Sequence, residues 1–191
     1  MAHDGPPLTA GEGDRLEQCT SAAASRMERM SNESAGIGPD VVAIFQHRHA
    51  YLRTLIADLD PEALAWLPGP DTTSISNLVL HIAGSVAAGF RVLTGDTRER
   101  DRDAEFDTAP LTAAELIERI DAADRELERY RDGLTLDDLT EIRPRPGRNQ
   151  AWPGVQVLLN NFGHLMEHIA QIALTRQLYE QHRQEIAGPL P

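Results

Sequence analysis

The sequence predicts an all-α protein built as a four-helix bundle. In four separate segments the apolar residues recur at the 3.6-residue period of an amphipathic helix, and residues that cap or break helices bound each segment. No segment shows the Val, Ile and Thr alternation that is typical of strands. Four amphipathic helices within about 150 residues bury their apolar faces most simply against one another, as they do in a bundle.

The chain begins with a segment that we expect to stay outside the bundle. Residues 1–38 are rich in Gly, Ala, Ser and charge and contain few large apolar residues. Such a leader buries too little surface to offset the entropy lost on ordering, so we predict that it is flexible or weakly helical. The bundle is expected over residues 39–186, followed by a tail at 187–191.

The first predicted helix spans residues 41–59 and ends at Asp60-Pro61, because the residue before a proline is disfavoured in the helical region. Its expected core side follows the helical period and comprises Val41, Phe45, Arg48, Leu52, Leu55, Ile56 and Leu59.

The second predicted helix spans residues 74–93. The helix-breaking residues Pro-Gly-Pro-Asp at 68–71 precede it, residues 72–74 offer N-caps, and Gly95 closes it. Its apolar stripe comprises Ile75, Leu78, Ile82, Val86 and Leu93.

The third and fourth predicted helices complete the bundle. The third begins with a capping box formed by Thr112 and Glu115 and ends by Gly133. The fourth opens at Pro153, a residue suited to a first helical turn, and runs to about residue 185. The long connection between the second and third helices permits them to run parallel.

Charge and cysteine content narrow the classes of function. The formal net charge of −12 disfavours binding to nucleic acid or to an anionic membrane surface, since such binding depends on Lys and Arg. The sequence has no uninterrupted apolar stretch long enough to predict a membrane span, and no secretory signal is evident. We therefore expect a cytoplasmic protein. The single cysteine, Cys19, can form neither an internal disulfide nor a Cys-rich zinc site.

Three histidines form the candidate functional site. His164 and His168 are four residues apart, which places their side chains next to each other on one helical face. His81 lies in a different apolar helix and could supply a third nitrogen. Three protein ligands with an open position are typical of a catalytic metal site.

A helical wheel at about 100° per residue places the histidine pair on one shoulder of the apolar stripe. Asn161 and Gln171 fall on the same shoulder and are candidates for contact with a substrate. Glu167 falls on the opposite side and is expected to face water, and the HExxH order of zinc proteases is absent. The remaining histidines are expected in solvent or at helix boundaries: His3, His47, His49 and His182.

The chain resembles the DinB-like superfamily over residues 41–179. This superfamily includes YfiT-like metal-dependent hydrolases, a mycothiol-dependent maleylpyruvate isomerase, and bacillithiol or mycothiol S-transferases. The resemblance rests on LDPEALAWLPGPDTTSISNLVLHIAG and LLNNFGHLMEHIAQIAL. The family pattern has one histidine midway along the second helix and HxxxH on the fourth, and His81, His164 and His168 occupy those positions.

The resemblance implies a bundle whose second and third helices are parallel. It also implies a divalent metal held by the three histidines, with zinc favoured over nickel, and a possible homodimer. It does not imply DNA binding.

Three functions remain open. The first is a transferase or isomerase that activates a low-molecular-weight thiol as cosubstrate, because a metal favours the thiolate form. The second is a metal-dependent hydrolase, which the lack of an evident carboxylate base on the histidine shoulder disfavours. The third is a non-catalytic protein that binds a metal or ligand in a stress response. The first two act on a small-molecule substrate.

Overall fold

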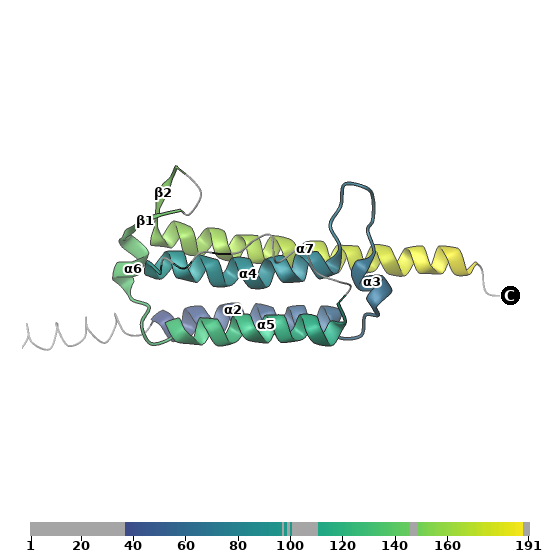
Figure 1. Ribbon diagram of the computed structural model, residues 1–191, viewed down its shortest axis with the longest axis horizontal. Helices are drawn as coiled ribbons and strands as arrows, with labels where there is room; N and C mark the ends of the chain where they lie inside the picture. The colour runs from purple at the N-terminus through teal and green to yellow at the C-terminus, as the bar shows by residue number, and fades with distance from the viewer. Residues whose placement is uncertain (1–36, 97, 99, 101–110, 146–148, 189–191) are drawn as a thin grey trace, which may run out of the picture.

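The computed structural model describes residues 37–96, 98, 100, 111–145 and 149–188. Four long helices run side by side along one axis, as predicted (Figure 1). They are α2 (Ile37–Ile56), α4 (Ile75–Thr94), α5 (Ala113–Leu127) and α7 (Gly154–Ala187). The shorter elements are α3 (Pro61–Ala65), the 3-10 helix η2 (Glu128–Tyr130), α6 (Leu136–Thr140), β1 (Ile142–Pro144) and β2 (Ala151–Pro153).

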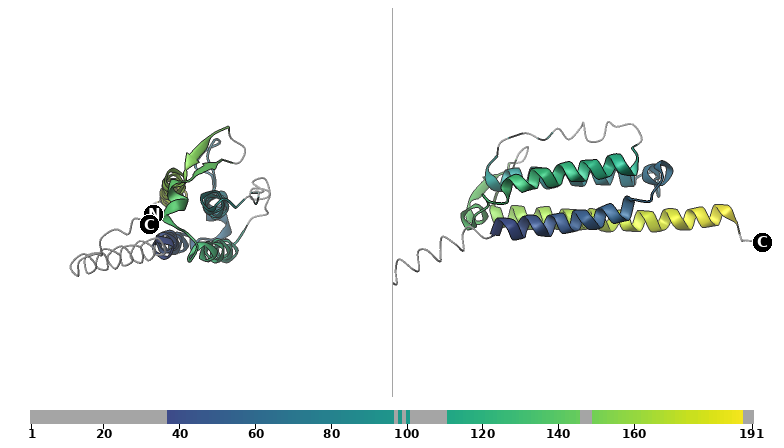
Figure 2. Two further views of the ribbon diagram at one scale, coloured as in Figure 1. Left: turned by 90° about the vertical axis from the view of Figure 1, so that its left-hand side faces the viewer. Right: turned by 90° about the horizontal axis from the view of Figure 1, so that it is seen from below.

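Helices α4 and α5 are parallel, which confirms the topology expected from the sequence. Arg91 in the last turn of α4 makes a bidentate pair with Glu126 at the end of α5, with N–O distances of 2.7 and 2.8 Å. Helix α2 is antiparallel to α5, since Gln46 bonds Glu128 whereas Arg53, further along α2, bonds Asp121. Figure 2 shows the four helices end on and from below.

The termini of α4 and α5 are fixed by the caps that the sequence predicted. The Ser74 hydroxyl accepts from the Asn77 amide, and Gly95 closes α4 in the left-handed conformation at φ 73°. Thr112 and Glu115 form the complete capping box of α5. Each cap satisfies backbone groups that a helix end leaves without partners. These caps therefore set where both helices begin.

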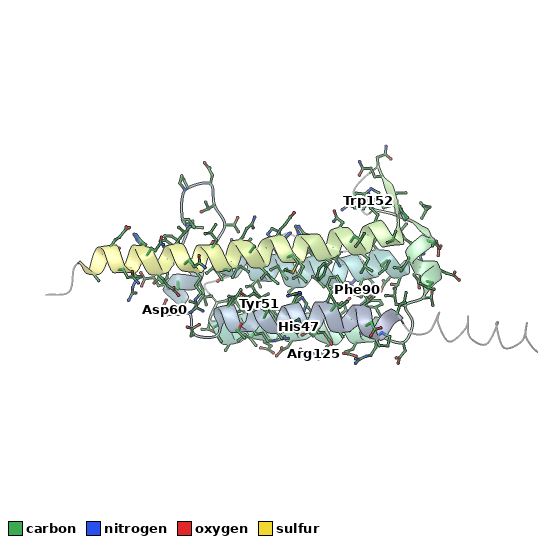
Figure 3. The ribbon with its side chains drawn as sticks, turned by 180° about the vertical axis from the view of Figure 1, so that it is seen from behind. His47, Tyr51, Asp60, Phe90, Arg125 and Trp152 are labelled. Carbon is green, nitrogen blue, oxygen red and sulfur yellow. The ribbon has the colours of Figure 1, made fainter. Side chains whose placement is uncertain are left out.

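The core is continuous through the bundle. Phe45 of α2 packs edge-on against Phe90 of α4 and Phe162 of α7, with ring centroids 5.0 and 5.5 Å apart. In Figure 3, Phe90 lies between the helices, whereas Arg125 lies on the outer side of α5. Phe45 therefore joins α2 to the two helices that carry the predicted histidine ligands, α4 and α7.

The stretch between α5 and α7 contains elements that the sequence pattern does not predict. No helix or strand is expected between Gly133 and Pro153, but this stretch forms α6 and an antiparallel hairpin in which β1 pairs with β2. Helix α3 was also missed. These elements have three to five residues, which is too short for a periodic pattern to show. The third helix gives way to η2 after Leu127, earlier than Gly133 suggested.

The buried side of α2 differs from the predicted stripe. Phe45, Leu52 and Ile56 are buried as predicted, but Val42 and His49 are buried in place of Val41 and Arg48. The expectation that His49 lies in solvent or at a boundary is wrong, because its side chain is fully buried. Pairing with Asp124 makes that burial possible, as described below. The helix also begins at Ile37, two residues inside the predicted leader.

Helix α4 is long and apolar enough to cross a membrane by length and composition alone, with a mean hydropathy of 1.3 over its most apolar window. Half of that window is buried inside the bundle. Helix α4 packs against both α5 and α7. Because packing on two sides requires apolar residues on two sides, burial accounts for the composition.

Candidate metal centre

Two neighbouring helices bring the three predicted histidines together. His81 lies midway along α4, and His164 and His168 lie on successive turns of α7. The side-chain amide of Asn161 donates to the Val86 carbonyl at 3.1 Å and ties α7 to α4 one turn from His164. A Cβ on Gly89 would come within 2.1 Å of that amide, so the helices approach this closely only with glycine there.

The Nε2 atoms of the three histidines converge on one point. The Nε2 atoms of His81 and His164 are 2.8 Å apart, and those of His164 and His168 are 3.2 Å apart. Two nitrogens bound to one tetrahedral zinc at their usual bond lengths are about 3.3 Å apart. All three side chains are half-buried, so the cluster is held by the bundle and still reaches its surface. The residues therefore fit a single metal ion.

The hydrogen bond of His168 directs a lone pair into this cluster. Its Nδ1 lies 2.7 Å from the Gln171 side-chain oxygen, which can only accept, so the ring hydrogen is on Nδ1. Nε2 of His168 then carries a lone pair that faces His164 at 3.2 Å. Proteins commonly orient a metal-binding imidazole in this way, by letting its outer N–H donate to an acceptor on a neighbouring residue. A cation between the rings would be stabilised by these lone pairs.

The position of Gln171 and Asn161 is now defined. Gln171 is exposed on α7 and bonds His168, and Asn161 is buried and bonds the backbone of α4. Both lie within a turn of the histidine pair, on the predicted shoulder. Their contact with a substrate stays a prediction.

One residue near the cluster was not anticipated from the sequence. A terminal guanidinium nitrogen of Arg100 lies 3.3 Å from Nδ1 of His81 and 3.3 Å from the His81 carbonyl oxygen. Arg100 belongs to the polar connection between α4 and α5, where no periodic pattern relates it to the histidines. No signal in the sequence therefore points to this contact.

Among the described residues, the side chains placed to hold one metal ion together are those of His81, His164 and His168. No carboxylate of the described residues belongs to this group. Glu167, between the two histidines in sequence, is exposed, as predicted. His47 is exposed, and His182 stacks on Trp66 at the far end of α7. His3 and Cys19 lie outside the described residues.

A second polar cluster, which contains one histidine, lies between α2 and α5. Nδ1 of the buried His49 is 2.6 Å from an oxygen of Asp124, whose other oxygen accepts from Arg53. Burial raises the pKa of Asp124, but the hydrogen bonds from His49 and Arg53 outweigh burial and bring it below its ordinary value. Nε2 of His49 is buried without a hydrogen-bond partner among the described residues.

Comparison with known proteins agrees with this architecture. The family model of the DinB superfamily matches residues 44–172. The crystal structure of a DinB-like protein from Bacillus subtilis, YjoA, aligns with a TM-score of 0.58 and 14% sequence identity, covering 80% of this chain and 96% of that chain. At this identity the structural likeness shows the fold alone. No match was found among curated proteins.

The matched region includes α4, α5 and every histidine of the cluster. The chain therefore belongs to the DinB superfamily.

Proposed function

We propose that this DinB-superfamily protein is a cytoplasmic, metal-dependent transferase that activates a low-molecular-weight thiol of the mycothiol or bacillithiol type. His81, His164 and His168 would hold the divalent metal, with zinc the first candidate and nickel the second. The observation that supports this most directly is the convergence of three Nε2 atoms, two pairs of which are 2.8 and 3.2 Å apart. Three nitrogens suit either metal.

The number of protein ligands favours a catalytic metal site over a purely structural one. A structural zinc site is closed by four protein ligands, whereas the described residues offer three. A divalent ion held by neutral imidazoles keeps its full charge and favours the thiolate form of a coordinating thiol, which is the reactive nucleophile. The sulfur lone pair would form the bond to an electrophilic carbon, the leaving group would depart with its bonding electrons, and the thiol proton would pass to solvent.

The residues of the chain have distinct tasks in this proposal. His168 is oriented by Gln171, and the contact of Asn161 with α4 fixes the spacing of the two helices that carry the ligands. The absence of Asp or Glu from the described metal-competent group supports a thiol over water as nucleophile, because hydrolysis benefits from a carboxylate base beside the metal.

Metal content measured by mass spectrometry tests the site. Wild-type protein, purified without added metal and then incubated with zinc or nickel, is expected to retain one equivalent per chain after desalting. His168→Ala is expected to lose most of it, because only two ligands remain. His47→Ala, which removes an exposed histidine from α2, is the matched control and should retain the metal. Circular dichroism verifies that each variant is folded.

Activity assays on the metal-loaded protein test the chemistry. Consumption of mycothiol or bacillithiol in the presence of an electrophile, lost in His168→Ala, is the expected result. Ester or amide hydrolysis without thiol would indicate the hydrolase instead. A protein that binds one metal and shows neither activity would indicate a binding function, and a folded wild type that retains no metal would overturn the proposal.

A further inference from the structure

One side of α7 presents a line of apolar residues to solvent. Among the described residues ten large apolar side chains are exposed, and four of them lie on this line, with exposed fractions from 37% to 66%. Two small exposed residues continue it. The line, called the α7 stripe below, comprises Val155, Leu159, Gly163, Ala170, Leu174 and Leu178.

The α7 stripe faces away from the bundle. Helices α2 and α4 pack against α7, and its core residues Leu165, Ile169 and Ile172 lie on the opposite side of the helix from the stripe. Figure 3 looks onto the face that α2 and α7 form together, where Tyr51 lies on α2. Tyr51 and Ile44 are 47% and 51% exposed, and the helical period turns both towards this face. They extend the apolar surface beside the stripe.

The charge of the chain favours a second copy as the molecule that covers this surface. Charged residues make up 25% of the sequence and the formal net charge is −12, but the stripe contains none of them. Two copies of so acidic a protein repel each other over most of their surfaces. A face without carboxylates is where they can approach.

Gly163, near the middle of the stripe, has room for a neighbour. A Cβ on Gly163 would meet nothing within 4 Å, whereas one on Gly89 or Gly154 would collide with an adjacent element. Glycine inside a helix costs stability relative to alanine, and packing against the rest of the described chain does not require it here. The close approach that a glycine permits is therefore available to a helix of another molecule.

The spacing of the stripe is symmetric. Its six positions are separated by 4, 4, 7, 4 and 4 residues, so they read the same in both directions from the point between Met166 and Glu167. A two-fold interface needs such an arrangement, because residue i of one copy then contacts residue j of the other and j contacts i. A partner of unrelated sequence imposes no such symmetry.

We propose that the α7 stripe binds the same stripe of a second copy in an antiparallel two-fold dimer. Leu159 packs against the partner's Leu174, and Gly163 packs against the partner's Ala170. Residues four apart form an inclined ridge on a helix, and two such ridges pack helices at an angle of about 50°, the commonest class of helix packing. The stripe and the histidines lie on different sides of α7, so this inference does not rest on the proposed function.

The size of the surface sets the expected affinity. Residues 155–178 form a strip about 36 Å long and about 10–12 Å wide, or roughly 400 Å² per copy before side-chain relief is counted. With Ile44 and Tyr51 beside them, two such strips reach the roughly 1,000 Å² in total that marks the lower end of specific interfaces. A dissociation constant in the micromolar range is therefore expected.

Sedimentation velocity of the full chain, from below to well above the micromolar range, tests the pairing. Leu159→Glu and Leu174→Arg, each alone, are expected to weaken dimerisation at least about 30-fold, as loss of a central contact does. A chain that carries both changes should regain the dimer, because opposite charges then face each other at both contacts. Ile186→Glu, at a 71% exposed position of α7 beyond the stripe, is the control and should behave like the wild type.

Glu167 provides a second measurement. It is exposed and adjoins the midpoint of the stripe, so a two-fold axis there brings the carboxylates of both copies side by side. Glu167→Gln should tighten the dimer about 2- to 3-fold at low salt, and less at high salt. Glu185→Gln, exposed on the same helix but far from the midpoint, should change the affinity little.

Each outcome decides a separate point, once circular dichroism has verified that every variant is folded. A wild type that stays monomeric throughout the concentration range would overturn the proposal. A dimer that survives Leu159→Glu would place the interface elsewhere. Dimerisation lost in both single variants and not regained in the double variant would overturn the antiparallel pairing. Metal retention should be equal in all these variants, so failure of the dimer leaves the proposed function standing.

Discussion

The bundle contains two polar clusters with opposite electrostatic arrangements, one made of three histidines and one in which a single histidine faces an aspartate. Between α4 and α7, three half-buried imidazoles face one another, and no carboxylate among the described residues joins them. Between α2 and α5, the fully buried His49 faces a carboxylate that also binds Arg53. In the first cluster three ring nitrogens face one another without a described carboxylate, whereas the second cluster contains both charges, on Asp124 and Arg53. Histidine content alone therefore says nothing about metal binding; the partner of each ring decides it.

The clusters also differ in what they contribute to the fold. Removing one partner from a buried pair leaves the other polar group without compensation, which is costly. The rings of the first cluster are only half-buried, so water can reach the groups left behind when one ring is removed, and we expect its histidines to contribute to stability mainly when a metal is bound. One cluster should therefore govern stability without metal, and the other should govern metal affinity.

The largest difference is expected between two single variants, each of which removes one histidine from one cluster. His164→Ala should lower zinc affinity about 100- to 1,000-fold, because a four-ligand structural zinc site is worth about 10–16 kcal/mol, or about 2.5–4 kcal/mol per ligand. It should leave the stability of the metal-free protein nearly unchanged. His49→Ala should keep zinc affinity within about threefold and lower the free energy of unfolding by about 2–3 kcal/mol through lost packing and an uncompensated Asp124.

Zinc competition with a chromophoric chelator and urea unfolding of the metal-free proteins provide the two measurements. Comparable losses of zinc affinity in both variants would break the distinction between the clusters. Comparable losses of stability would break it equally.

The sequence anticipated one cluster and missed the other for a physical reason. His164, His168 and His81 lie on shoulders of strongly apolar stripes, so the helical period alone places them at an interface. His49 is polar, and a hydrophobic pattern assigns polar residues to the surface. Its burial depends on Asp124, 75 residues away, and no local pattern encodes that pairing.

The same reasoning separates the predicted from the unpredicted parts of the fold. The four long helices follow from their periods, and the N-cap Ser74 and the capping box at Thr112 fix two of their starts. The hairpin depends on tertiary contacts instead. Gly154 approaches the Asp138 carbonyl so closely that a Cβ would come within 1.8 Å, a constraint that the sequence does not show.

A smaller effect is expected from pH at the buried pair. The pKa of Asp124 lies below its ordinary value of 3.8 in the folded chain, so its contribution to stability is fully present above that value. The contribution should be lost as pH falls through the lower folded pKa. Asp124→Asn should therefore reduce the free energy of unfolding by about 1–2 kcal/mol at pH 7 and by less near pH 2.

Urea unfolding of the wild type, Asp124→Asn and Asp121→Asn at both pH values measures this difference. Asp121 bonds the same arginine but is 45% exposed, so Asp121→Asn should change stability little at either pH. An Asp124→Asn deficit that does not shrink at low pH would assign the loss to packing and not to charge. The pair of His49 and Asp124 would then no longer differ in its electrostatics from the three-histidine cluster.

The smallest effect should come from the acceptor that orients His168. Gln171→Leu keeps the approximate size of an exposed side chain but removes the oxygen that fixes the hydrogen of His168 on Nδ1. Loss of such a partner lowers metal affinity by about 10-fold in the weaker cases, and exposure to water favours the weaker end because solvent can replace the bond. Gln177→Leu, on the same helix and also exposed, is the control. If zinc affinity falls equally in both variants, the loss comes from a leucine on α7 and not from His168, and the proposed orientation of the ring by Gln171 is wrong. A 10-fold loss confined to Gln171→Leu would instead show that the ring arrangement of the α4–α7 cluster is maintained for a metal before any metal binds.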